Sequence, residues 1–277
     1  MRIVEVISGL GLGGAERALA TRLKYCPQEI ETIVLRTGKE TSEIEEEVKK
    51  YANVTELKGS LTQAIVAASP DAIVTHNPRE AVRVLSSKKV VREVPIVCVA
   101  HNEIISENAW KSQLMKPVLH RVNNRAALYI AVSSRAARGE QCVGASSVVV
   151  SHLGAEADLS CTPDYRIWPA ETKIRLLAMA RFSPQKNFAS LLHAVSSQQD
   201  LMRERGAHLS VVGDGPLRSE LDRIIAHENL QDIASIHAWQ SSPDRAFAGA
   251  DALIIASSHE GGPLTLYEAL LHGLRVV

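Results

Sequence analysis

The sequence predicts an α/β protein built from two Rossmann-like domains. Short runs rich in β-branched residues alternate with amphipathic helical segments from end to end, a pattern typical of parallel sheets covered by helices on both faces. Residues 154–172 interrupt this alternation with two prolines and no periodicity. A chain of 277 residues is also longer than one hydrophobic core usually serves. We therefore expect a first domain over 1–155, a linker over 156–172 and a second domain over 173–277.

The strands follow from short apolar runs that are bounded by turn residues. The first such run, RIVEVIS, opens the chain, and the same kind of run recurs in both predicted domains. In chain order, strands are expected over 2–8, 32–37, 53–57, 72–76, 95–101, 128–133, 147–152, 174–180, 208–214, 234–239 and 251–257. The final GLRVV has the composition of another buried strand, so we expect the second domain to be incomplete as given.

Composition excludes several classes of protein. Lys plus Arg and Asp plus Glu both number 31, which argues against the basic footprint of a nucleic-acid-binding protein. The cysteines are far apart and form no C-x-x-C pair, so neither a disulfide scaffold nor a zinc site is expected. The N-terminus does not resemble a signal peptide, and no apolar run approaches the ~20 residues of a membrane span. We expect a cytoplasmic protein whose membrane contact, if any, is peripheral.

The glycine loop VISGLGLGGAERAL raises the question of which phosphate it holds. Gly9, Gly11 and Gly14 satisfy the G-x-G-x-x-G fingerprint of dinucleotide-binding proteins, between a strand and a helix. A nicotinamide site needs an acid at the end of the second strand to hold the ribose, and that position carries Arg36. This leaves an NADP-dependent enzyme as one interpretation. A tight strand–helix turn without a ligand is another.

Two cations follow the first strand of the second domain, in ARFSPQKN. Arg181 and Lys186 are five residues apart on a loop before a helix, so both can converge on one anion. A diphosphate suits this pair, because Arg donates forked hydrogen bonds and Lys supplies a mobile point charge. The alternative is two solvated surface cations.

The segment SSHEGGPLTLYEALLHG is the most specific in the chain. Glu260 follows a strand, and Pro263 opens a helix whose first amides, from Gly262 to Leu264, form an anion site. Glu268 lies roughly 7 to 8 Å further along the helix axis, at 1.5 Å per residue. Carboxylates suit ligands rich in hydroxyl groups, so one acid can bind a sugar and the other a ribose. The alternative is one capping acid and one solvated acid.

Two histidines end strands of the first domain. His101 ends the strand in VCVAHNE, and His76 ends the preceding one. Ligands bind at the carboxyl ends of parallel strands, so His101 is a candidate for the reacting site, with weaker support for His76. A purely structural role is open for both.

Residues 107–125 predict a basic amphipathic helix. Its apolar side chains recur at i, i+4 spacing, with lysines and arginines beside them. Such a helix can lie on an anionic membrane, although packing against the sheet explains the pattern too. The residues concerned are Trp110, Leu114, Val118 and Val122, flanked by Lys111, Lys116, Arg121 and Arg125.

Taken in order, these motifs resemble those of the retaining nucleotide-sugar glycosyltransferases of family 4, which have the GT-B fold of two Rossmann-like domains facing a central cleft. The resemblance spans the chain. It rests on GGAER (13–17), His101, VSS (132–134), the R-x4-K pair, GDGP (213–216) and EGGPLTLYEAL, in which seven residues separate Glu260 from Glu268.

The resemblance implies a role for each matching position. The first domain would bind the acceptor, a glycan or lipid-linked molecule, and the second would bind the nucleotide-sugar donor. The donor diphosphate would be approached by Gly13, Gly14, Arg181, Lys186, Gly262, Pro263 and Leu264. Glu260 would hold the donor sugar, Glu268 the ribose, and His101 would line the reacting face. No cofactor is implied, and no metal, since the chain has no D-x-D motif.

Two departures from the family pattern leave the choice of nucleotide base open. The chain has HAWQ (237–240) where the family usually has a glycine, and Arg275 where it usually has a proline. An NADP-dependent oxidoreductase remains an alternative, although it gives Glu260 and Glu268 no role. An epimerase or a phosphorylase of the same fold is a second alternative, and a non-catalytic homologue is a third.

Overall fold

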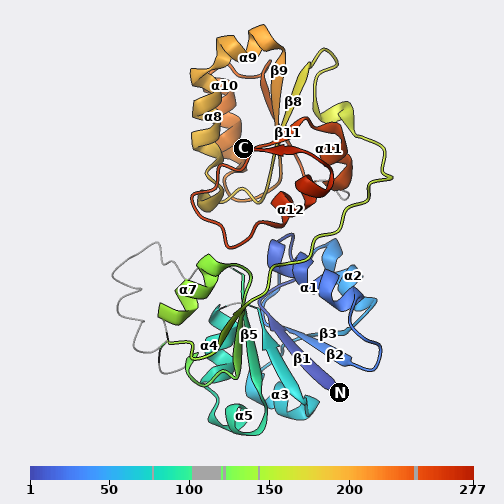
Figure 1. The fold of residues 1–277 in the computed structure, drawn as a ribbon, viewed down its shortest axis with the longest axis vertical. Helices are drawn as coiled ribbons and strands as arrows, with labels where there is room; N and C mark the ends of the chain where they lie inside the picture. The colour runs from blue at the N-terminus through green and yellow to red at the C-terminus, as the bar shows by residue number, and fades with distance from the viewer. Residues whose placement is uncertain (77, 102–119, 121–122, 143, 240–242) are drawn as a thin grey trace. The chain divides into compact units, whose positions relative to one another are not determined.

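The computed structural model describes residues 1–277 except for 77, 102–119, 121–122, 143 and 240–242. The chain divides into two compact units, Met1–Gly154 and Ala155–Val277 (Figure 1). The segment expected as a linker is part of the second unit. It contains the short 3-10 helix η1 (Tyr165–Ile167), and Ile167 and Trp168 are buried in that unit's core.

The described residues of the first unit form a seven-stranded parallel sheet of order β3-β2-β1-β4-β5-β6-β7. The strands are short and their central residues are apolar, as the sequence predicts. They are β1 (Arg2–Ile7), β2 (Glu31–Arg36), β3 (Asn53–Glu56), β4 (Ala72–Thr75), β5 (Ile96–Ala100), β6 (Leu128–Ala131) and β7 (Val148–Val150).

Helices cover both faces of this sheet. Helices α1 (Gly14–Lys24) and α2 (Glu43–Lys49) pack on the face that carries Ile7 and Val34. Helices α3 (Leu61–Ala68), α4 (Pro78–Leu85) and α5 (Lys88–Glu93) pack on the face that carries Val4 and Val6 (Figure 1). Helix α7 (Ser134–Cys142) packs beside β6 through alanines. Serine hydroxyls cap α2, α3 and α5, each contributing about 1 kcal/mol to helix stability.

The described residues of the second unit form a five-stranded parallel sheet of order β10-β9-β8-β11-β12. Its strands are β8 (Ile174–Met179), β9 (Ala207–Val212), β10 (Ala234–His237), β11 (Ala252–Leu253) and β12 (Arg275–Val276). Helices α8 (Phe188–Ser197), α9 (Gln199–Arg205) and α10 (Arg218–His227) lie on one face, and α11 (Pro243–Gly249) and α12 (Leu264–Leu271) on the other (Figure 1).

The predicted fold class of parallel α/β sheets is confirmed, with every expected strand present. The strand expected over 251–257 is shorter than predicted, since only Ala252 and Leu253 pair with both neighbours. The amides of Ile254 and Ile255 still donate to the carbonyls of Leu177 and Val277, and the loop before α12 follows them.

Each sheet has one point at which the strand order reverses. In the first sheet this switch lies between β1 and β4, and in the second between β8 and β11. In open parallel sheets, ligands bind outside the carboxyl ends of the strands at such a point. The candidate residues in the loops after β1, β4, β8 and β11 therefore stand where the topology places a site.

Candidate functional site

In the second unit, the switch between β8 and β11 brings together a lysine and a glutamate from two different loops. The 3-10 helix η2 (Pro184–Lys186) follows β8 and presents Lys186. Lys186 Nζ donates to Oε1 of Glu260 at 2.5 Å, and the two side chains are only 21% and 18% exposed. A charge-assisted hydrogen bond in such a half-buried place fixes the position of both groups.

Gln185 joins these two loops. Its side-chain amide donates to the carbonyl of His259 at 2.8 Å. Its own carbonyl accepts from the backbone amide and the hydroxyl of Ser258, at 2.9 and 3.1 Å. The loop after β8 and the loop after β11 are thus cross-linked beside the Lys186–Glu260 pair, which holds the pair in place before any ligand binds.

A pocket opens at this point. Lys186 and Glu260 line it, together with Thr265 from the first turn of α12 and the carboxyl-terminal residues of β8 and the β11 loop. Helix α12 begins at Leu264, and its N-cap residue Pro263 offers no side-chain hydrogen bond to the first amides. The full lining is Met179, Ala180, Lys186, Phe188, Ile254, Ile255, Ala256, Ser257, Glu260 and Thr265.

The structure brings together only part of the predicted donor site. Lys186 and Glu260 share the pocket, whereas Arg181, Glu268 and Gly262 are not among its lining residues. Sequence reasoning missed Thr265 and Ser257, whose hydroxyls line the same pocket. Thr265 directly follows Leu264 and Ser257 lies three residues before Glu260, so the motif itself was the available signal.

The GDGP turn has a packing role. A Cβ on Gly215 would lie 2.6 Å from the carbonyl oxygen of Phe182, and Gly215 has a φ of +151°. The amide of Phe182 donates to the carbonyl of Asp214 at 2.8 Å. Because the turn after β9 presses on the backbone that leads to η2, glycine is required here for close approach.

In the first unit, the GGAER motif begins α1 at the switch point. Gly13 is the N-cap residue of α1 and Gly14 its first helical residue. A side chain on Gly13 would overlap the carboxylate of Glu16, whereas Gly14 faces open space. A carboxylate in the first turn stabilises the helix dipole but repels a phosphate, so this helix end suits a hydroxyl-rich ligand better than a diphosphate.

The other glycines of the apparent dinucleotide fingerprint make room for one of the protein's own side chains. A Cβ on Gly9 would lie 3.0 Å from Cβ of Glu40, and a Cβ on Gly11 would lie 2.5 Å from Oε1 of Glu40. The Leu10 amide also donates to the carbonyl of Glu40 at 2.9 Å. The space that a pyrophosphate would need beside these glycines is filled by a carboxylate side chain.

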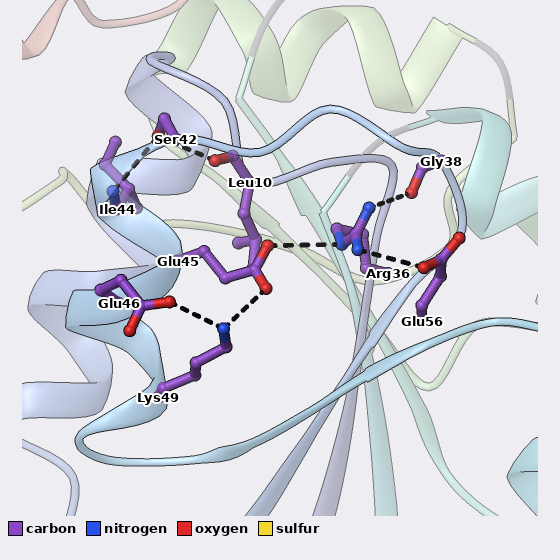
Figure 2. Close-up of polar contacts among 9 residues, drawn as sticks. All are labelled: Leu10, Arg36, Gly38, Ser42, Ile44, Glu45, Glu46, Lys49 and Glu56. Carbon is purple, nitrogen blue, oxygen red and sulfur yellow. Dashed lines mark hydrogen bonds and ion pairs between the residues drawn. The ribbon is translucent and has the colours of Figure 1, made fainter.

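Arg36, the residue on which the NADP interpretation depends, is committed to other partners. Its side chain is 9% exposed and lies 3.6 Å from Glu45 and 3.5 Å from Glu56. It also donates to the carbonyl of Gly38 at 2.6 Å (Figure 2). With two carboxylates against it, the guanidinium is not available to a 2′-phosphate, so the structure gives no support to the NADP alternative.

A buried polar chain crosses the switch point of the first unit. Glu5, in the middle of β1, is fully buried and accepts from Arg22 of α1. His76 Nε2 lies 2.6 Å from the other oxygen of Glu5, and His76 Nδ1 lies 3.1 Å from Nε2 of His101. The two imidazole rings stack with centroids 5.4 Å apart. Both predicted histidines therefore belong to one cluster.

The environment of His101 favours the neutral imidazole. Burial, and secondly the neighbouring His76, lower the pKa of His101 to about 3. Glu5 was missed in the sequence because a single acid in an otherwise apolar run gives no indication of its partner. Its position at the centre of a buried strand was the only available signal.

Parts of the sequence interpretation lie outside the described residues. The basic helix expected over 107–125 is almost wholly among them, as is Gln240 of HAWQ. Among the residues that are described, no group of three or more His, Cys, Asp or Glu side chains is arranged to hold a metal ion. In the same residues no helix has the length and apolar character needed to cross a bilayer.

Solved structures share the fold of this chain. The chain superposes over its whole length on Anabaena HepE in complex with UDP-glucose, covering 79% of it with a TM-score of 0.80 and 19% identity. It superposes equally completely on WaaG, a glycosyltransferase involved in lipopolysaccharide biosynthesis, covering 80% of it with a TM-score of 0.69 and 12% identity. The two parallel α/β sheets are those of the GT-B glycosyltransferases, so the fold predicted from the motifs is confirmed.

The second unit is similar to a known family. Residues 166–277 match the model of the Glycosyl transferases group 1 family. A segment of 92 residues is 33% identical to the lipopolysaccharide core biosynthesis glycosyltransferase LpsD of Rhizobium meliloti, covering 33% of this chain and 25% of LpsD. A segment of 108 residues is 29% identical to the amylovoran biosynthesis glycosyltransferase AmsD of Erwinia amylovora, covering 39% of this chain and 30% of AmsD.

Proposed function

We propose that the protein transfers a glycosyl group from a nucleotide-diphosphate sugar to a hydroxyl group of a glycan or lipid-linked acceptor, with retention of anomeric configuration and without a metal ion. The observation that carries this proposal is the pocket at the β8–β11 switch point, where Lys186 and Glu260 meet beside the N-terminus of α12. A cation, a carboxylate and helix amides together match a ligand that has both phosphate and hydroxyl groups.

The positive groups stabilise the leaving group. Transfer breaks the bond between the anomeric carbon and the diphosphate oxygen, and forms a bond from that carbon to the acceptor oxygen, whose proton passes to the departing diphosphate. Negative charge then develops on the terminal phosphate. This charge is neutralised by Lys186, Arg181 and the backbone amides of Gly262, Leu264 and the first turn of α12. In other transferases a metal ion performs this task.

The two glutamates bind hydroxyl groups of the donor. Glu260, held in place by Lys186, accepts hydrogen bonds from the sugar. Glu268 lies on α12, further from the helix N-terminus, and accepts from the ribose. In the first unit, which binds the acceptor, Gly13, Gly14 and His101 contact hydroxyl groups of a saccharide ligand.

Relatives support a role in the synthesis of surface saccharides. LpsD and AmsD are named for lipopolysaccharide core and amylovoran biosynthesis, and HepE has been crystallised with UDP-glucose. UDP-glucose is therefore the first donor to test. We place the protein in the cytoplasm, in peripheral contact with anionic lipid.

Ligand-detected NMR with UDP-, GDP- and ADP-sugars and with NADPH tests the proposal. We expect wild type to bind one nucleotide sugar, and Glu268→Ala to lose that binding. Glu171→Ala is the matched control, because Glu171 is an exposed carboxylate just before the amino-terminal end of β8, whereas the pocket lies at the carboxyl end of that strand. Binding of NADPH alone would overturn the proposal in favour of an oxidoreductase.

A further inference from the structure

The cluster at the switch point of the first sheet contains more than the histidine that the motifs predict. Glu5, His76 and His101 form an unbroken chain of contacts of 2.6 and 3.1 Å. Three separate strands supply them: Glu5 lies within β1, His76 directly follows β4 and His101 directly follows β5. Neighbouring parallel strands in register thus bring three polar groups into line.

The balance of charge among these buried groups determines which ring nitrogens of His76 carry a proton. Glu5 is fully buried, and Arg22 already forms an ion pair with it, so the carboxylate is neutralised without His76. Protonating His76, which is 3% exposed, would leave a net positive charge in a buried cluster, and such a charge is costly. His76 is therefore neutral and donates its Nε2 proton to Glu5.

One proton position then sets the next. A neutral imidazole has one donor and one acceptor nitrogen. Since Nε2 of His76 carries the proton, Nδ1 of His76 is an acceptor and must receive a hydrogen bond from Nε2 of His101, 3.1 Å away. Nε2 of His101 consequently carries a proton and Nδ1 of His101 does not.

The series of contacts from Glu5 through His76 to His101 ends at a nitrogen atom that has no hydrogen-bond partner in the part of the chain that the structure describes. Nδ1 of His101 is buried and has no hydrogen-bond partner among the described residues. A buried acceptor without a donor is unfavourable, because it has lost its hydrogen bonds to water. A ligand hydroxyl that donates to this nitrogen would recover that free energy, whereas an anion would be repelled by the lone pair.

We propose that Glu5 and His76 are positioning residues that hold His101 in the Nε2-protonated tautomer, so that its bare Nδ1 accepts a hydrogen bond from a hydroxyl group of a neutral saccharide ligand. The identity of the ligand rests on the proposed function, whereas the tautomer does not. Arg22 completes the arrangement from α1 by cancelling the charge of Glu5. His101 would thus recognise a sugar hydroxyl and reject a phosphate at the same place.

Nitrogen-15 NMR of the imidazole side chains tests the relay, because protonated and bare ring nitrogens have well-separated shifts. The His101 signals are assigned by their loss in His101→Asn. In wild type at neutral pH we expect a protonated Nε2 and a bare Nδ1 at His101. Glu5→Gln and His76→Phe are expected to shift this signal toward a mixture of the two tautomers; the phenyl ring keeps the stacking and removes both nitrogens.

Asp244→Asn is the matched control. His272 Nε2 lies 2.9 Å from Oδ1 of Asp244 in the second unit, which is another histidine–carboxylate pair. This variant should change His272 and leave His101 unaltered. The proposal is overturned if His101 carries its proton on Nδ1 in wild type, a result that needs no variant to fold. It is also overturned if both first-unit variants retain the wild-type His101 spectrum.

The readout separates this relay from the proposed function. The nitrogen shifts are measured without donor, acceptor or turnover. A correct tautomer in a protein that binds no nucleotide sugar would refute the transferase and leave the relay standing. A wrong tautomer in a protein that does bind the donor would refute the relay alone.

Discussion

Lys186 Nζ lies 2.5 Å from Oε1 of Glu260, although 74 residues separate the two in the sequence. The contact exists because β8 and β11 are neighbours at the switch point, so the loops after them leave the sheet side by side. The pair combines a phosphate-binding cation with a hydroxyl-binding carboxylate. Changing each member separately should therefore affect different parts of a nucleotide-sugar ligand.

Lys186→Met should weaken binding of the free nucleoside diphosphate about 10- to 100-fold, because a charge-assisted hydrogen bond contributes about 1.5 to 3 kcal/mol. Isothermal titration calorimetry with UDP, GDP and ADP measures this. Lys49→Met is the control, since Lys49 also forms ion pairs but lies on α2 of the first unit. Equal affinity of wild type and Lys186→Met for each diphosphate would remove Lys186 from the site.

Unlike Lys186→Met, Glu260→Gln should weaken binding of the nucleotide sugar and leave binding of the free diphosphate intact. Removing the carboxylate leaves Lys186 without its ion-pair partner and removes a repulsion toward phosphate, so affinity for the free diphosphate should be unchanged or higher. Affinity for the nucleotide sugar should fall about 10-fold, because the amide replaces a charged acceptor of sugar hydroxyl groups. The ratio of the two affinities, measured by the same titrations, is the decisive quantity. A parallel loss for both ligands would contradict the assignment of Glu260 to the sugar.

The sequence predicted the fold almost completely because strand periodicity is a local property. Each β-branched run became a strand in chain order, and even GLRVV contributes β12. Among the strands only the lengths were wrong, most clearly at β11, since an apolar composition does not reveal where hydrogen-bonded pairing ends.

The site was less predictable because its contacts are non-local. The strand ends identified Lys186, Glu260 and His101, but nothing in the sequence shows that Glu5 contacts a histidine 71 residues away. The glycine fingerprint was misleading for the same reason. Whether such a loop faces a pyrophosphate or a carboxylate depends on a side chain from elsewhere, here Glu40.

Gly215→Ala should destabilise the second unit by about 1 to 3 kcal/mol. The new Cβ would lie 2.6 Å from a backbone oxygen of Phe182, which cannot move without shifting the β8 loop. Urea unfolding followed by fluorescence of the buried Trp168 reports this. Gly154→Ala is the control, because a Cβ there meets nothing within 4 Å. Similar unfolding midpoints for the two variants would show that the turn is not closely packed.

Arg36→Met should destabilise the first unit by about 2 to 4 kcal/mol, because it leaves Glu45 and Glu56 facing each other without the buried guanidinium between them (Figure 2). Lys49→Met removes an exposed member of the same network and should leave the unfolding midpoint near that of wild type. Hydrogen exchange of the β2 amides measures the loss in the first unit alone. If Arg36→Met were as stable as Lys49→Met, the guanidinium would be free to serve a ligand.

The buried His101 should make the first unit sensitive to mild acid. Burial and His76 lower the pKa of His101 to about 3, below the unfolded value of about 6.5. The unfolded chain therefore takes up this proton first, so the contribution of His101 to stability is complete above pH 6.5 and is lost as the pH falls toward 3. Between pH 6.5 and 5 the loss should be about 1.6 kcal/mol.

His101→Gln removes the titrating group and keeps a polar side chain of similar length. Its free energy of unfolding should fall less than that of wild type over the same interval, because glutamine takes up no proton. Hydrogen exchange of the β5 amides at both pH values gives the comparison within the first unit. Parallel pH profiles for wild type and His101→Gln would mean that His101 can be protonated in the folded protein. Burial would then not keep its imidazole neutral.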